Sequence, residues 1–148
     1  MVVPPWLPVS STATQQQLMS MDVGDGALEM YRPSPNIVYT RARGRCAAAL
    51  AEGWVTSTAN IWSTVDKLTV FNVWQLMTSY DSAARSSLTS WVLAHRLQFS
   101  TAWFSSGSRL VSMGVSVAGV ATSMFGVPMH APPERETFLQ QLAASLTP

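Results

Sequence analysis

Residues 68–80 read LTVFNVWQLMTSY, and the assignment of this stretch decides the fold class of the chain. The run is rich in β-branched and aromatic residues, and its length suits a strand as well as a helix. No partner strand is recognisable elsewhere in the sequence, and a lone strand is not stable. We therefore expect residues 68–80 to be helical, with a strand as the alternative.

The prolines divide the chain into a central region and two ends. None of the nine prolines lies between residues 36 and 127. Because proline interrupts helices and central strands, regular structure is expected inside that gap. We expect residues 1–36 to form an extended arm, residues 37–108 a helical region, and residues 129–148 a C-terminal tail.

Two amphipathic helices are expected in the helical region. The first is expected to begin near Arg43 and to extend at least to Val65, because apolar residues recur there at helical spacing. The second is expected over residues 83–104, after the favourable N-cap signal Asp81-Ser82. The predicted fold class is mainly α: an extended N-terminal arm, two or three amphipathic helices and one transmembrane helix.

The transmembrane helix is expected over residues 109–128. The stretch from Leu110 to Val127 carries no charge, and its 18 residues span about 27 Å as a helix, close to the roughly 30 Å of a bilayer core. Small residues recur at every fourth position of this stretch, which favours close helix packing in lipid; they are Gly114, Ala118, Thr122 and Gly126. The alternative is a buried helix within a helical bundle.

Arginines flank the expected helices. Arg41, Arg43 and Arg45 precede the first one, and Arg109 stands immediately before the transmembrane stretch. Positive residues beside apolar segments are typical of contacts with anionic lipid headgroups, so we interpret these four as lipid or interface contacts. For the first three, a solvated or salt-bridging cluster is the alternative.

The composition excludes several classes of protein. The net charge is +1 and only 11% of residues are charged, so a nucleic-acid binder that neutralises phosphates is not expected. A single cysteine, Cys46, excludes a disulfide scaffold and a multi-cysteine metal site. The two histidines, His95 and His130, are 35 residues apart and form no metal-ligand pattern. We expect no metal, no cofactor and no catalytic residues.

The resulting hypothesis is a non-catalytic accessory subunit of a large membrane complex, of the respiratory-chain or ATP-synthase type. The shortage of charge and the six tryptophans are typical of a chain covered by lipid or by other subunits. The expected partners are therefore protein subunits and membrane lipids, with no small-molecule substrate. The expected location is the mitochondrial inner membrane, with a thylakoid or other organellar membrane as the alternative.

Two other hypotheses remain open. One is a helical scaffold or interaction protein of a large particle such as a ribosome or a capsid. The other is a small enzyme or cofactor carrier that uses His95, which lies on the apolar face of its expected helix. A hydrogen-bonded core histidine is the simpler interpretation of that residue.

Overall fold

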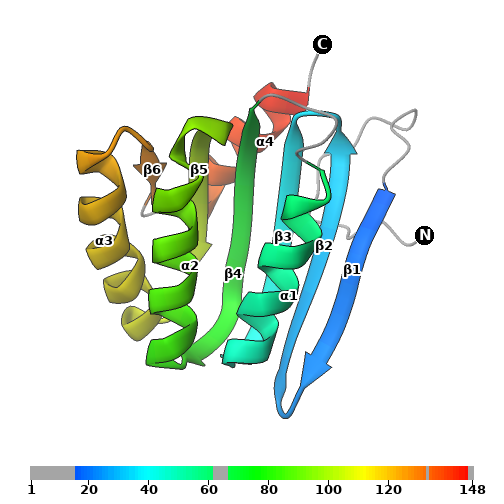
Figure 1. The fold of residues 1–148 in the computed structure, drawn as a ribbon, viewed down its shortest axis with the longest axis vertical. Coiled ribbons are helices and arrows are strands. Elements are labelled where there is room, and N and C mark those ends of the chain that lie inside the picture. The colour runs from blue at the N-terminus through cyan, green and yellow to red at the C-terminus, as the bar shows by residue number, and fades with distance from the viewer. Residues whose placement is uncertain (1–15, 62–66, 133, 147–148) are drawn as a thin grey trace.

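The computed structural model describes residues 16–61, 67–132 and 134–146 of the chain, and it shows an α/β fold (Figure 1). The elements in chain order are β1 (Gln16–Val23), β2 (Gly26–Ser34), β3 (Ile37–Cys46), α1 (Ala48–Ala59), β4 (Leu68–Tyr80), α2 (Ser82–Ala94), the one-turn helix η1 (Arg96–Gln98), β5 (Phe99–Ser106), α3 (Arg109–Met124), β6 (Met129–His130) and α4 (Arg135–Leu146).

The described strands form one six-stranded mixed sheet whose spatial order follows the chain, β1-β2-β3-β4-β5-β6. Strands β1, β2 and β3 are antiparallel neighbours, and β3, β4, β5 and β6 are parallel neighbours. The β1–β2 hairpin turns at Gly24-Asp25, where Gly24 has a positive φ of 60° that favours glycine. Parallel neighbours need crossover connections, and α1, α2 and α3 provide them.

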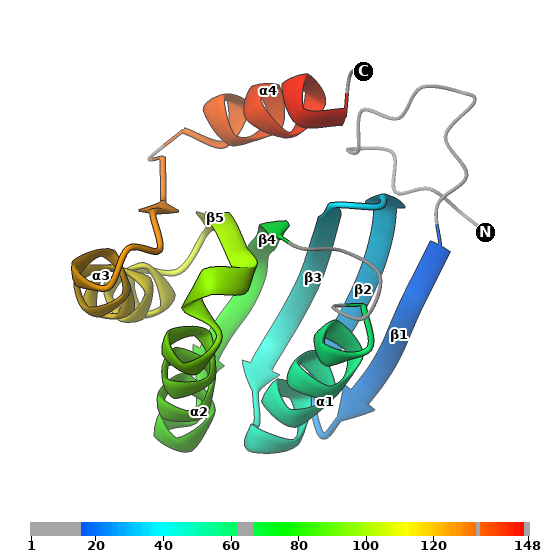
Figure 2. The same ribbon diagram turned by 45° about the horizontal axis from the view of Figure 1, so that its top comes forward.

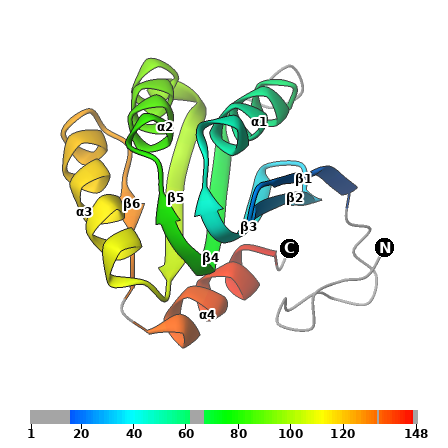
Figure 3. The same ribbon diagram turned by 90° about the horizontal axis from the view of Figure 1, so that it is seen from below.

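The molecule has three layers. Helices α1, α2 and α3 cover one face of the sheet and α4 crosses the other (Figures 2 and 3). The larger apolar cluster lies under α1, α2 and α3 and includes Val38, Val70 and Val111. The smaller cluster joins the opposite face to Phe138 and Leu142 of α4, which are fully buried.

The central strand β4 explains why residues 68–80 form a strand. Val70 faces the helices α1 to α3, whereas its neighbours Phe71 and Val73 face α4. The sequence of a strand that is buried on both faces is a continuous apolar run. It lacks the alternation of apolar and polar residues that is typical of a half-exposed strand. Its hydrogen-bonding partners are β3 on one side and β5 on the other.

The predicted mainly α fold class is therefore wrong. The expected helical region, residues 37–108, holds three strands as well as α1 and α2. The expected extended arm holds β1 and β2 over residues 16–34, and both pair into the sheet. The rest of that arm, residues 1–15, lies outside the described residues.

The predicted membrane span is also wrong. A helix does form there, but α3 has 16 residues. Throughout the described parts of the chain, no helix combines the length and the apolar character needed to cross a bilayer. The expectations of a membrane protein in the mitochondrial inner membrane, or in a thylakoid, rested on this span and are corrected with it. The apolar residues of α3 are instead divided between the buried core and an exposed face.

Candidate functional site

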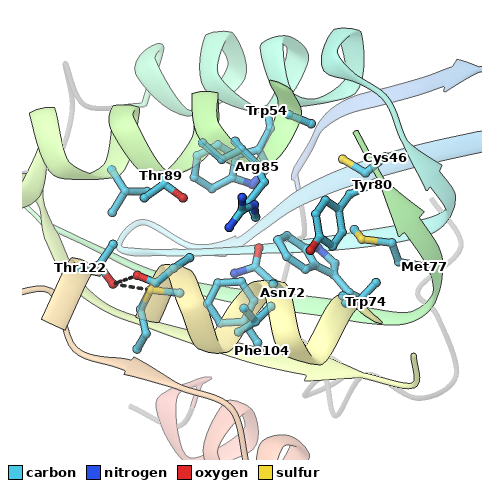
Figure 4. Close-up of a pocket in the computed structure, with 18 residues that line it drawn as sticks. Cys46, Trp54, Asn72, Trp74, Met77, Tyr80, Arg85, Thr89, Phe104 and Thr122 are labelled. Atoms are coloured by element: carbon cyan, nitrogen blue, oxygen red, sulfur yellow. Dashed lines mark hydrogen bonds between the residues drawn. The ribbon is translucent and has the colours of Figure 1, made fainter. Parts of the chain in front are cut away.

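An apolar cavity lies between the sheet and the helices α1, α2 and α3 (Figure 4). Its volume is about 100 Å³, which is smaller than the cavity of about 150 Å³ that binds benzene in an engineered protein core. The floor is formed by side chains of β4 and β5, including Asn72, Trp74 and Phe104. The space therefore suits one ring or a short alkyl chain.

The wall formed by α3 depends on small side chains. Gly114, Ala118 and Thr122, which are one helical turn apart, all line the cavity. A Cβ atom on Gly114 would lie 2.6 Å from Tyr80 Oη, so only glycine lets α3 approach Tyr80 this closely. The row of small residues thus brings α3 against the end of β4 and leaves room in the cavity beside it.

Two buried hydrogen-bond donors on residues that line this cavity have no acceptor among the described residues. Arg85 Nε, from α2, and Trp54 Nε1, from α1, are both buried and make no hydrogen bond to any of the described residues. Figure 4 shows the Arg85 side chain reaching into the cavity from the helix side, towards Asn72. An unsatisfied buried donor costs about 1–3 kcal/mol, so such groups are rare without a reason.

Asp81, the acidic residue that precedes α2, already accepts a hydrogen bond from Arg45. Asp81 precedes α2 by one residue and is one turn from Arg85, but its Oδ1 accepts a hydrogen bond of 2.7 Å from Arg45 Nε. No ion pair joins Arg85 to an acid within the described ranges. The guanidinium therefore presents a positive charge to an apolar space, and this charge would favour an anion there.

A polar network supports the cavity floor. Thr40 Oγ1 donates to Asn72 Oδ1 at 2.8 Å and accepts from Trp74 Nε1 at 3.2 Å. Asn72 Nδ2 also donates to the Trp103 carbonyl at 3.3 Å. Because a carboxamide nitrogen carries two hydrogens, Asn72 has a second N–H that it can offer to a ligand. Thr40 and Asn72 are almost completely buried, so the network fixes the position of this amide.

Cys46 lines the cavity but is poorly suited to act as a nucleophile. Burial, with a smaller contribution from the negative charge of Asp81, raises the pKa of the Cys46 thiol to about 11. Cysteine reacts as the thiolate, so this thiol is unreactive at neutral pH. The cavity thus offers positive charge and hydrogen-bond donors, and its one thiol stays protonated.

The structure separates the residues expected for helix packing. Gly114, Ala118 and Thr122 lie on the inner side of α3 and line the cavity. Gly126 lies beyond the end of α3, with a positive φ of 88°. The first three thus pack α3 against its own sheet in this fold.

Three of the four arginines expected at a lipid interface lie near carboxylates. Arg41 Nη1 lies 4.0 Å from Glu29 Oε2, and Arg43 Nη2 lies 3.5 Å from Asp22 Oδ1. Arg45 forms an ion pair with Asp81. This arrangement matches the salt-bridging alternative that the sequence left open for these three. Arg109 is exposed at the first position of α3. None of the four lines the apolar cavity.

Each of the two histidines makes a contact within the fold. His95 follows α2, where its Nδ1 is 2.9 Å from the Trp91 carbonyl, in keeping with a hydrogen-bonded histidine. His130 stacks on Trp103 with the ring centres 4.3 Å apart. In the described part of the chain, no group of three or more His, Cys, Asp or Glu side chains is arranged to hold a metal ion.

Sequence reasoning missed the residues that define the cavity. Neither Arg85 nor Trp54 belongs to a sequence pattern that predicts a binding site. Asn72 carried a visible signal, since it is the one strongly polar side chain within the apolar run LTVFNVW. No local pattern could have joined these three residues, because they come together only when α1 and α2 pack on β4.

Comparison with known proteins supports the fold. No protein-family model matches the sequence, and no curated protein matches it. Among solved structures, the chain is similar to an uncharacterised protein of the DUF3478 family from Shewanella loihica PV-4, which has a SpoIIAA-like fold. The TM-score is 0.58 at 13% identity, covering 84% of this chain and 98% of that one. At this identity the likeness shows a shared fold and nothing about activity.

Proposed function

We propose that the chain is a non-catalytic binding protein for a small apolar molecule that carries a carboxylate. The observation that carries this proposal is the pair of unsatisfied buried donors, Arg85 Nε and Trp54 Nε1, on two residues that both line one apolar cavity. A ligand with an acceptor group would satisfy them. The proposal keeps the expected absence of catalysis, but it replaces the expectation that no small molecule is bound.

The carboxylate is favoured over a neutral acceptor because of Arg85. An arginine stays charged in a protein, and hydrogen bonds between ionised partners contribute about 1.5–3 kcal/mol. The indole N–H of Trp54 and the second amide N–H of Asn72 add neutral donors around the same space. The apolar part of the ligand would contact Leu88, Val92 and Phe104, which are among the lining residues.

The size of the cavity limits the apolar part. A volume of about 100 Å³ is smaller than a benzene-binding cavity of about 150 Å³, so a chain of about five or six carbons or one small ring is the expected body. Hexanoate and benzoate are therefore suitable probes. Hexanamide has the same chain as hexanoate without the charge, and it is the matched neutral probe.

The experiment measures the affinity of hexanoate and hexanamide by isothermal titration calorimetry for the wild type and for Arg85→Gln. We expect the wild type to prefer hexanoate, and we expect Arg85→Gln to weaken hexanoate binding about 10- to 100-fold with little change for hexanamide. Arg109→Gln removes the same charge from an exposed position outside the cavity, so it should bind hexanoate like the wild type.

Two results would contradict the proposal. One is equal binding of hexanoate by the wild type and by Arg85→Gln, since the arginine would then have no part in recognition. The other is the absence of binding by the wild type of hexanoate, benzoate and hexanamide at millimolar concentration. Trp54→Phe keeps the aromatic contact but removes the N–H donor, and it should weaken hexanoate binding several-fold.

A further inference from the structure

The outer face of α3 carries an exposed apolar stripe. This α3 stripe consists of five residues whose side chains are each between 49% and 78% exposed: Leu110, Met113, Val117, Val120 and Met124. They recur at steps of three and four residues along 16 residues of helix. That is the spacing of a seam between two packed helices. The inner face of the same helix is occupied by the core and the cavity, so the stripe lies on the side away from the sheet.

We propose that the α3 stripe is the interface of a two-fold symmetric dimer, in which α3 packs antiparallel against α3 of a second copy. The spacing of the stripe residues is nearly the same from the N-terminal end of α3 as from its C-terminal end. An antiparallel pair centred on Val117 therefore places Val117 beside its own equivalent. Leu110 then meets the partner's Met124, and Met113 meets the partner's Val120. A patch that matches itself under a two-fold rotation is what an isologous interface requires.

Charge favours this antiparallel arrangement. No charged residue lies between Leu110 and Phe125, so two copies of the stripe meet without repulsion. Arg109 begins α3, whose first turn has no acidic residue, and a positive charge is unfavourable at a helix N-terminus. In an antiparallel pair each Arg109 lies beside the C-terminal end of the partner's helix, where a positive charge is favourable. A parallel pair would bring the two arginines together.

The area of the stripe is sufficient for a dimer. At roughly 170 Å² for a fully exposed large apolar residue, the exposed fractions of the five stripe residues amount to about 530 Å² per copy. Two copies would bury up to about 1,060 Å², which is just above the roughly 1,000 Å² that a biological interface should exceed and more than most crystal contacts bury. A neutral patch of this size on a monomer is also at the upper end of what is usually found.

The first test measures the mass of the full chain by sedimentation velocity from 1 to 100 μM. We expect a concentration-dependent dimer for the wild type. Val117→Glu should raise the dimer dissociation constant at least 100-fold, because each dimer would hold two facing carboxylates. Ser90→Glu adds the same charge to an exposed position on α2 and should dimerise like the wild type. Val117 is 58% exposed, so Val117→Glu is expected to retain the wild-type circular dichroism spectrum.

The second test determines the direction of the helices by cysteine cross-linking in a Cys46→Ala background. Oxidation of an equimolar mixture of Leu110→Cys and Met124→Cys should give a disulfide-linked dimer, whereas neither variant alone should cross-link efficiently. A monomeric wild type at 100 μM would overturn the proposal, and so would a dimer that Val117→Glu does not weaken. Cross-linking of Leu110→Cys alone would overturn the antiparallel arrangement. A wild type that is monomeric and co-sediments with phosphatidylcholine vesicles would assign the stripe to lipid instead.

Discussion

Replacement of Thr40 by valine tests whether the polar network under the cavity stabilises the fold. Thr40 is fully buried, and its hydroxyl both donates to Asn72 Oδ1 and accepts from Trp74 Nε1. Valine has nearly the same shape but can do neither. The substitution therefore leaves Asn72 Oδ1 without its donor and Trp74 Nε1 without its acceptor.

The expected loss follows from these two groups. A buried polar group without a partner costs about 1–3 kcal/mol. The cost for Asn72 should be near the upper part of that range because Asn72 is 2% exposed, whereas the half-buried Trp74 should contribute less. The added methyl group of valine returns up to about 0.8 kcal/mol. We expect a net loss of about 2–3 kcal/mol, or about 5–10 °C in Tm for a chain of this length.

Urea unfolding followed by circular dichroism at 222 nm measures this loss, and Thr58→Val is its matched control. Thr58 is also fully buried, but its hydroxyl donates to the Trp54 carbonyl at 2.8 Å, within the same helix. Its removal leaves no donor or acceptor unpaired, since the α1 backbone already uses that carbonyl. Thr58→Val should cost less than about 1 kcal/mol. Equal losses for the two variants would refute the reasoning about the network.

Three further predictions concern the buried thiol, the glycines and α4. Iodoacetamide should modify Cys46 of the folded chain at pH 8 about 100-fold more slowly than an unperturbed thiol, because burial raises the pKa of Cys46 from 9.0 to about 11. The stability that the protonated thiol contributes is present below pH 9 and is lost as the pH rises through 11. Cys46→Ala should therefore reduce the loss of stability between pH 9 and pH 11. Gly26→Ala should lower the free energy of unfolding by more than about 2 kcal/mol, because the added Cβ would clash with the Arg45 carbonyl oxygen. Gly53→Ala is the control: its Cβ meets only flexible methionine side chains, so it should leave the stability in urea unchanged or raise it. Phe138→Ala should lower the free energy of unfolding by about 3–5 kcal/mol or expose α4 to limited proteolysis. The reason is that this fully buried ring packs edge-on against Phe71, with the ring centres 5.7 Å apart.

The helices were the part of the fold that the sequence predicted best. The expected start at Arg109 agrees with the start of α3, and the expected start near Ala83 is one residue from that of α2. Both helices follow polar residues that suit an N-cap, and Ser108 accepts a hydrogen bond from the Val111 amide in the structure. Local signals of this kind do not depend on what the rest of the chain does.

The strands could not be predicted because their signals are not local. Phe99 and Trp103 lie four residues apart, a spacing that fits one side of a helix. The sequence therefore predicts one helix over residues 83–104, which includes most of strand β5. In β5 the two residues lie on opposite faces of the sheet, because the register shifts after Phe99. The partners of β4 lie about 30 residues away on either side, Ile37–Cys46 and Phe99–Ser106. Without them, the apolar run of β4 was assigned to a helix.

The absence of charge from residues 110–127 had a different cause from the one expected. One side of α3 is buried against the sheet and the cavity, and the opposite side carries the exposed α3 stripe. A helix with two apolar faces gives the same sequence pattern as a membrane span. Length and composition distinguish α3 from a membrane span. Its 16 residues are about 24 Å long as a helix, and many of them are serine, glycine or threonine.

The most direct test of the central claim is the indole N–H signal of Trp54 in a ¹H–¹⁵N correlation spectrum, assigned with Trp54→Phe. Hexanoate supplies an acceptor to this donor, which has none among the described residues. On titration, the Trp54 signal should move downfield and saturate, and Arg85→Gln should weaken the titration at least 10-fold. A Trp54 signal that stays in place while hexanoate reaches 10 mM would contradict the account of the cavity as a carboxylate-binding site.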